Sequence, residues 1–81
     1  MPVVFVLYGF RFFFYSNEGD PREPVHIHVR KDRNLAKFWL EPEVRLAGSS
    51  GFSAVELNRI SKIINTRRIE IAEAWNEHFN S

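Results

Sequence analysis

The sequence predicts a small α+β domain: a four-stranded antiparallel sheet built from two hairpins, with one face covered by a long C-terminal helix. Two observations support this fold class. The first half of the chain is rich in β-branched and aromatic residues interrupted by turn residues. The second half repeats its apolar residues at helical spacing. With 81 residues, the chain has the length of one domain, which we take as residues 1–81.

Four segments have the composition of strands. Residues 3–8 and 10–15 are separated by Gly9, which indicates a tight hairpin. A cluster of turn-forming residues follows at 16–21. Residues 25–31 and 35–41 are then separated by Asp32-Arg33-Asn34, which indicates a second hairpin, and Pro42 ends the last strand.

The helix is predicted to run from Ala54 to Phe79. Ser53 and Glu56 have the spacing of a capping box, in which each side chain accepts a hydrogen bond from the backbone N–H of the other residue. Apolar residues then recur every three or four positions: Leu57, Ile60, Ile64, Ile71 and Trp75.

The length of this helix raises the question of a partner. Unbroken, it would extend about 40 Å, whereas six-residue strands form a sheet only about 20 Å long. Trp75 and Phe79 would then lie beyond the sheet, and we expect a homodimer to cover them. A break near Asn65-Thr66, just before Arg67 and Arg68, would remove that reason, and the sequence leaves both alternatives open.

Strand alternation separates the side chains onto two sheet faces. One face is entirely apolar and is predicted to lie under the helix: Phe10, Phe12, Phe14, Val25, Ile27, Val29, Ala36, Phe38 and Leu40. The other is basic and aromatic, and no second helix is expected to cover it: Arg11, Phe13, Tyr15, His26, His28, Arg30, Lys37, Trp39 and Glu41. An uncovered face with large aromatic side chains favours a ligand or a partner.

Composition narrows the classes of function. The 11 Lys+Arg nearly balance the 10 Asp+Glu, which argues against a general polyanion binder but permits a local basic patch. There are no cysteines, so no disulfide framework is possible. The apolar N-terminus resembles neither a signal peptide nor a membrane span, so we expect a cytoplasmic protein with no membrane partner. No glycine-rich phosphate loop, serine nucleophile elbow or dinucleotide fingerprint occurs, and no cofactor is expected.

The pair His26-x-His28 is the most informative motif, and three interpretations remain open. The rings could be surface or partner contacts. They could act as a general acid and base, because imidazole titrates near neutrality, with Arg30 stabilising developing charge. In that interpretation the catalytic residues are His26, His28 and Arg30, and the RNA-binding residues are Arg11, Phe13, Tyr15, Lys37 and Trp39.

A metal site is the third interpretation. Two histidines supply two ligands, whereas zinc requires three or four. Glu18, Asp20 and Glu41 are candidates for the others, but their spacing fixes none of them. We therefore predict no metal ligand.

Several segments resemble a known bacterial family, catalogued as domain of unknown function 4160, across nearly the whole chain. They are Phe12-Phe13-Phe14-Tyr15-Ser16-Asn17-Glu18-Gly19, His26-Ile27-His28-Val29, Ala36-Lys37-Phe38-Trp39-Leu40-Glu41-Pro42, Gly51-Phe52-Ser53 and Glu73-Ala74-Trp75-Asn76-Glu77-His78-Phe79. The family usually reads Pro-Pro-His-x-His, whereas Val25 replaces the second proline here. The resemblance implies a toxin-like component of a bacterial toxin–antitoxin pair, and it supplies no catalytic residue.

Two hypotheses follow from the sequence. In the first, the protein is a toxin component that acts on RNA through the His-x-His face, as a metal-independent ribonuclease if it is an enzyme, and is neutralised by a cognate antitoxin-like protein. In the second, it is a non-enzymatic interaction module that docks a partner protein or self-associates.

Overall fold

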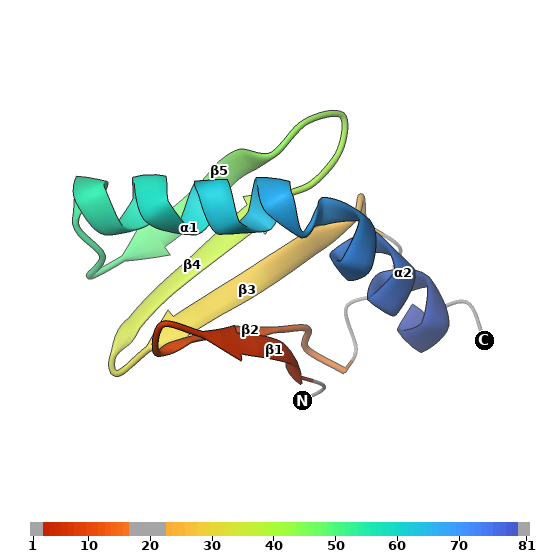
Figure 1. The fold of residues 1–81 in the computed structure, drawn as a ribbon, viewed down its shortest axis with the longest axis horizontal. Coiled ribbons are helices and arrows are strands. Elements are labelled where there is room, and N and C mark those ends of the chain that lie inside the picture. The colour runs from red at the N-terminus through yellow and green to blue at the C-terminus, as the bar shows by residue number, and fades with distance from the viewer. Residues whose placement is uncertain (1–2, 17–22, 80–81) are drawn as a thin grey trace.

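The computed structural model describes residues 3–16 and 23–79 and shows a five-stranded antiparallel sheet with two helices (Figure 1). The strands lie side by side in the order of the chain. They are β1 (Val3–Leu7), β2 (Phe10–Phe13), β3 (His26–Lys31), β4 (Asn34–Trp39) and β5 (Arg45–Ser50), followed by α1 (Ala54–Thr66) and α2 (Arg68–Phe79). The α+β class with an antiparallel sheet is confirmed, but the predicted number of strands is wrong, and the helical segment takes the broken form that the sequence left open.

The two predicted hairpins are present. Leu7 pairs with Phe10 across a two-residue loop in which Tyr8 and Gly9 both have positive φ, at 53° and 81°. A type I′ turn requires that conformation, because its twist matches the twist of the strands. The second hairpin turns at Asp32, whose φ is 57°, between β3 and β4.

The fifth strand corrects the prediction of four. β5 pairs with β4 in antiparallel register, with a bulge beside Lys37 and Phe38. All six of its residues are exposed, and their side chains are mostly small or polar. The strand therefore lacks the apolar alternation that identifies a half-buried strand in a sequence.

The predicted apolar face forms the core. Eight of its nine residues are buried, and Val25 packs against them half-buried. The helices complete this core with the buried side chains Ile60, Ile64, Ile71 and Trp75. Because burying a large apolar side chain contributes roughly 1.5–3 kcal/mol, this layer between helices and sheet is the main source of stability.

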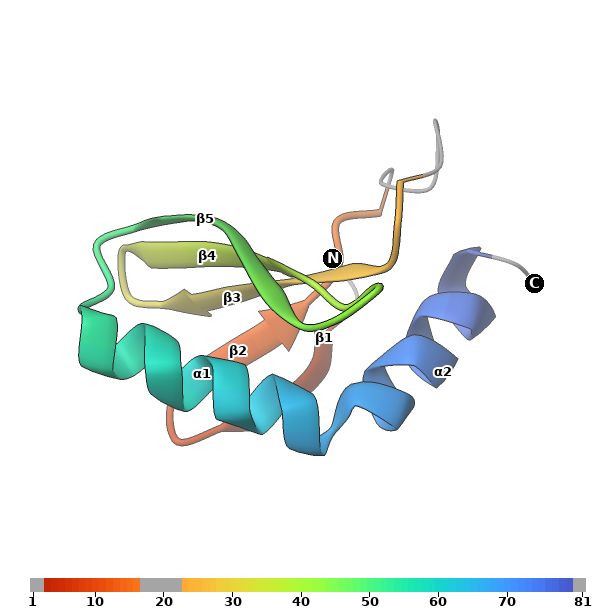
Figure 2. The same ribbon diagram turned by 90° about the horizontal axis from the view of Figure 1, so that it is seen from above.

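The helical segment is two helices, not one. It breaks at Arg67, whose φ of −106° and ψ of 21° depart from helical values. The Arg67 guanidinium lies 4.4 Å from the centre of the Phe5 ring and 3.8 Å from the Glu70 carboxylate, so it is held at the bend. Figure 2 shows α1 running along one side of the sheet and α2 turning at its end.

This bend overturns the argument for a second subunit. Trp75 is only 2% exposed, and its ring contacts Phe14 and Phe79 within the same chain. The helix therefore leaves no aromatic overhang beyond the sheet. The homodimer predicted from that overhang loses its structural reason.

The start of α1 has the predicted capping box. The Ser53 hydroxyl accepts from the Glu56 N–H at 3.1 Å, and the Glu56 carboxylate accepts from the Ser53 N–H at 3.0 Å. Because the bond from the Ser53 backbone N–H favours the ionised carboxylate, it lowers the pKa of Glu56 below its usual value.

We predict that Ser53→Ala lowers the free energy of unfolding by about 1 kcal/mol, because it leaves the first turn of α1 without its cap. The control is Ser61→Ala in the middle of the same helix, where alanine is the better helix former. Urea denaturation of both variants measures the difference. Equal stability of the two variants would contradict the role given to Ser53.

Candidate functional site

The register of the sheet brings the predicted site residues together on the face opposite α1, here called the second face. Phe13, His28 and Lys37 are consecutive partners across β2, β3 and β4. Arg11 and Arg30 pair directly in the adjacent part of the β2–β3 ladder. His26 pairs with Trp39 nearer the other end of β3. All of these side chains therefore lie within one continuous surface.

The expectation that this face is uncovered is wrong at three positions. Phe13 and His26 are 0% exposed, and His28 is 8% exposed. Arg11 and Arg30 are exposed as expected. The second face thus consists of a buried aromatic part and an exposed basic part, a division that strand alternation alone does not show.

The three buried rings belong to a cluster of five, here called the aromatic cluster, in which Tyr15 and Trp39 are partly exposed: Phe13, Tyr15, His26, His28 and Trp39. Its rings touch in series, mostly edge to face. The centres of Tyr15 and His28 are 4.5 Å apart, those of His28 and His26 are 5.3 Å apart, and those of His26 and Trp39 are 5.6 Å apart. Phe13 stacks on His28 at 5.7 Å. Edge-to-face packing suits the quadrupoles of these rings and fixes their orientation.

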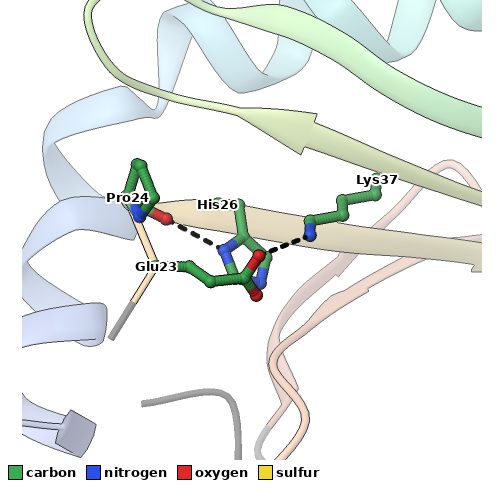
Figure 3. Close-up of polar contacts among 4 residues, drawn as sticks. All are labelled: Glu23, Pro24, His26 and Lys37. Atoms are coloured by element: carbon green, nitrogen blue, oxygen red, sulfur yellow. Dashed lines mark hydrogen bonds and ion pairs between the residues drawn. The ribbon is translucent and has the colours of Figure 1, made fainter. Parts of the chain in front are cut away.

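His26 joins the second face to the C-terminal helix. Its ring centre lies 4.9 Å from that of Trp75 in α2. Its Nδ1 lies 3.0 Å from the carbonyl oxygen of Pro24 (Figure 3). A carbonyl oxygen only accepts hydrogen bonds, so Nδ1 carries the proton in this contact. Buried and oriented in this way, the His26 ring holds the start of β3 against α2.

Lys37 is held by two contacts beside this ring. Its Nζ lies 3.2 Å from Oε1 of Glu23, as Figure 3 shows, and 4.4 Å from the centre of the Trp39 ring. Both partners are partly exposed, so the ion pair is worth little energetically. It does position the ammonium group over the aromatic cluster. Sequence reasoning missed Glu23, since nothing in its neighbourhood indicates that it returns to β4.

Arg11 and Arg30 form the exposed basic part, here called the arginine pair. Like charges directly opposite each other on neighbouring strands repel and cost stability. Within residues 3–16 and 23–79, neither arginine has an ion-pair partner. The pair therefore creates a local positive potential that favours an anion, although the net charge of the chain is only +1.

An open groove of about 440 Å³ lies beside the cluster, over β4 and β5. Its lining includes His28, Lys37 and the aromatic side chains of Tyr15 and Trp39. On the β5 side the lining is made of small residues: Ala47, Gly48, Ser49 and Ser50. Sequence reasoning missed these residues because it missed β5. Of the two histidines, it is His28 that reaches this groove.

The candidate metal ligands do not assemble in the part of the chain that is described. No group of three or more His, Asp or Glu side chains there is arranged to hold an ion. Glu18 and Asp20 lie outside the described residues. Glu41 is exposed and lines a different hollow, beside Arg68 at the start of α2.

Comparison with known families supports the resemblance seen in the sequence. The model of the family described as "Domain of unknown function (DUF4160)" matches residues 9–76. The chain belongs to this family. The match in this DUF4160 domain includes β2 to β5, α1, most of α2, and every residue of the aromatic cluster and the arginine pair. Comparisons with curated proteins and with solved structures give no match.

In the described part of the chain, neither helix is long and apolar enough to cross a membrane.

We predict that His26→Ala lowers the free energy of unfolding by about 2–4 kcal/mol, because it opens a cavity between Trp39 and Trp75 and removes the bond to Pro24. His78→Ala is the control, since that histidine is exposed in the last turn of α2. Chemical denaturation measures both. A loss no larger than that of the control would show that His26 does not hold the two elements together.

Proposed function

We propose that this DUF4160 domain binds RNA through its second face and serves as the toxin-like component of a bacterial two-protein module in the cytoplasm. The observation that carries the proposal is the arginine pair beside the aromatic cluster and its groove. Recognition of single-stranded RNA commonly combines cationic contacts to phosphates with aromatic stacking of bases. The pairing with an antitoxin-like protein rests on what the family resemblance implies.

The two parts of the second face have separate tasks in this proposal. The arginine pair attracts the phosphodiester backbone, because its charge is not neutralised by a neighbouring carboxylate within the described residues. Lys37 adds a third cation, which can exchange Glu23 for a phosphate, since an exposed ion pair is weak. The aromatic side chains of Tyr15 and Trp39 then present ring surfaces at the groove.

If the domain cleaves RNA, the structure favours His28 over His26 as the proton-transfer group. His28 lines the groove, whereas His26 is fully buried and bonded to Pro24. The His28 imidazole would take the proton of a ribose 2′-hydroxyl as that oxygen attacks the adjacent phosphorus. It would return the proton to the leaving 5′-oxygen as the P–O bond breaks. Lys37, directly across from His28 in the register, and Arg30 would stabilise the charge on the phosphoryl oxygens.

A non-enzymatic interaction module is the second candidate, and one observation favours it. β5 is the outer strand of the sheet, and all six of its residues are exposed. An open strand edge offers backbone groups to a strand from another chain. A partner protein or a second copy of the chain could dock there without any chemistry on the second face.

We predict that the double variant Arg11→Ala/Arg30→Ala weakens binding to a single-stranded RNA oligomer. It should also reduce the slope of log affinity against log salt by about 1.4, because each lost phosphate contact removes roughly 0.7. The control is Lys62→Ala/Arg68→Ala, which removes the same charge from exposed positions on the helices. Fluorescence anisotropy at several salt concentrations measures both. A wild-type protein that sediments as a dimer and binds no RNA would instead support the interaction module.

We predict that His28→Phe abolishes RNA cleavage while leaving RNA affinity within about twofold, because phenylalanine keeps the ring packing but transfers no proton. The measurement is cleavage of an end-labelled oligomer in chelator-treated buffer, with circular dichroism as the check on folding. Undiminished cleavage by this variant would exclude His28 as the catalytic group. If the wild-type protein cleaves no RNA, the catalytic role of His28 is excluded and only the proposed RNA binding remains.

A further inference from the structure

We propose that the groove over Gly48 is a nucleobase-binding site, in which one base of a single-stranded RNA inserts while its phosphates lie toward Lys37 and the arginine pair. This inference rests on the proposed function and deepens it, because it names the part of the RNA that is recognised. It also assigns a role to β5, which the catalytic hypothesis does not use.

The absence of a side chain at Gly48 opens the groove. Gly48 is the cross-strand partner of Lys37, so a side chain there would point to the second face. A β-carbon added at Gly48 would meet no atom within 4 Å. The space above this strand position is therefore empty, and the other β5 residues in the lining, Ala47, Ser49 and Ser50, are also small.

The groove has the size and walls that a planar ring requires. Its volume of about 440 Å³ lies within the usual range for small-ligand sites, roughly 300–1,000 Å³. Tyr15 and Trp39 contribute aromatic side chains, and both are partly exposed. His28 and Lys37 add polar atoms at the same place, which suit the ring nitrogens and exocyclic groups of a base.

Charge decides between a base and an apolar protein side chain as the occupant. Lys37 lines the groove, and Arg11 and Arg30 lie on the same sheet face in β2 and β3. Among the described residues, Glu23 is the carboxylate that contacts any of them. A nucleotide of RNA can place its base in the apolar groove and its phosphate against the cations. An apolar side chain of a protein can occupy the groove but leaves the cations without an anion.

Gly48 also provides a clean test. Its φ is not positive, so a branched side chain is compatible with its backbone and favoured in a strand. Gly48→Val should place a branched side chain in the groove, where a base would lie, without disturbing the fold, and Gly48→Ala should place a smaller one there. Leu46→Val is the matched control, because it places the same side chain on β5 at a residue that pairs with the buried Phe38 and does not line the groove.

The experiment compares two RNA oligomers of equal length, one with bases and one in which every base is removed. We expect the wild-type protein to bind the oligomer with bases about tenfold more tightly, a typical effect of stacking one base. Gly48→Val should abolish this difference, Gly48→Ala should reduce it, and Leu46→Val should preserve it. Adenosine monophosphate should shift the Gly48 amide resonance of the wild-type protein.

The outcomes distinguish a failure of the base site from a failure of the proposed RNA binding on which it rests. Equal affinity for the two oligomers, or an unchanged preference in Gly48→Val, would overturn the base site while leaving phosphate-driven RNA binding intact. Failure to bind either oligomer would overturn the proposed function and the base site together. A shift of the Gly48 amide with N-acetylphenylalanine amide but not with adenosine monophosphate would identify a protein side chain as the occupant and overturn the proposal.

Discussion

The structure depends on one constraint: the sheet has two faces, and in the described part of the chain the helices cover only one of them. The apolar face is buried under α1 and α2 in the way that most α+β domains bury theirs. On the second face α2 meets the ring of His26 through Trp75, but among the described residues no helix covers the other large rings. The domain resolves this conflict by packing those rings against one another, so that the second face forms a small aromatic layer of its own.

The bend at Arg67 connects these two layers. Because α2 turns at the end of the sheet, Trp75 touches Phe14 of the helix-covered face and His26 of the second face. This contact explains why two histidines on the same side of one strand have different environments. His26 lies where α2 meets the sheet and is enclosed, whereas His28 lies two residues further along and reaches the groove. The two histidines of the His26-x-His28 motif therefore differ in role: His26 is a buried structural residue, and His28 lines the groove.

The sequence contained enough information for most of the core and for little of the site. Apolar alternation in β2, β3 and β4 identified the buried face, and Ser53 and Glu56 identified the start of α1, because both signals are local. β5 was missed because its small, exposed residues carry no alternation. The burial of His26 was missed because it depends on the direction of α2 after Arg67. The contact between Glu23 and Lys37 was missed because it joins separate elements through side chains alone.

The order of the strands has a consequence for how the domain folds. Every strand pairs with its neighbour in the chain, so forming the sheet closes mostly short loops and costs little loop entropy. Proteins dominated by such local contacts fold quickly. The contact of Trp75 with His26 is different, because it joins the last helix to the third strand across a long stretch of chain. The second face consequently acquires its final form only when the C-terminus docks, which couples completion of the site to completion of the fold.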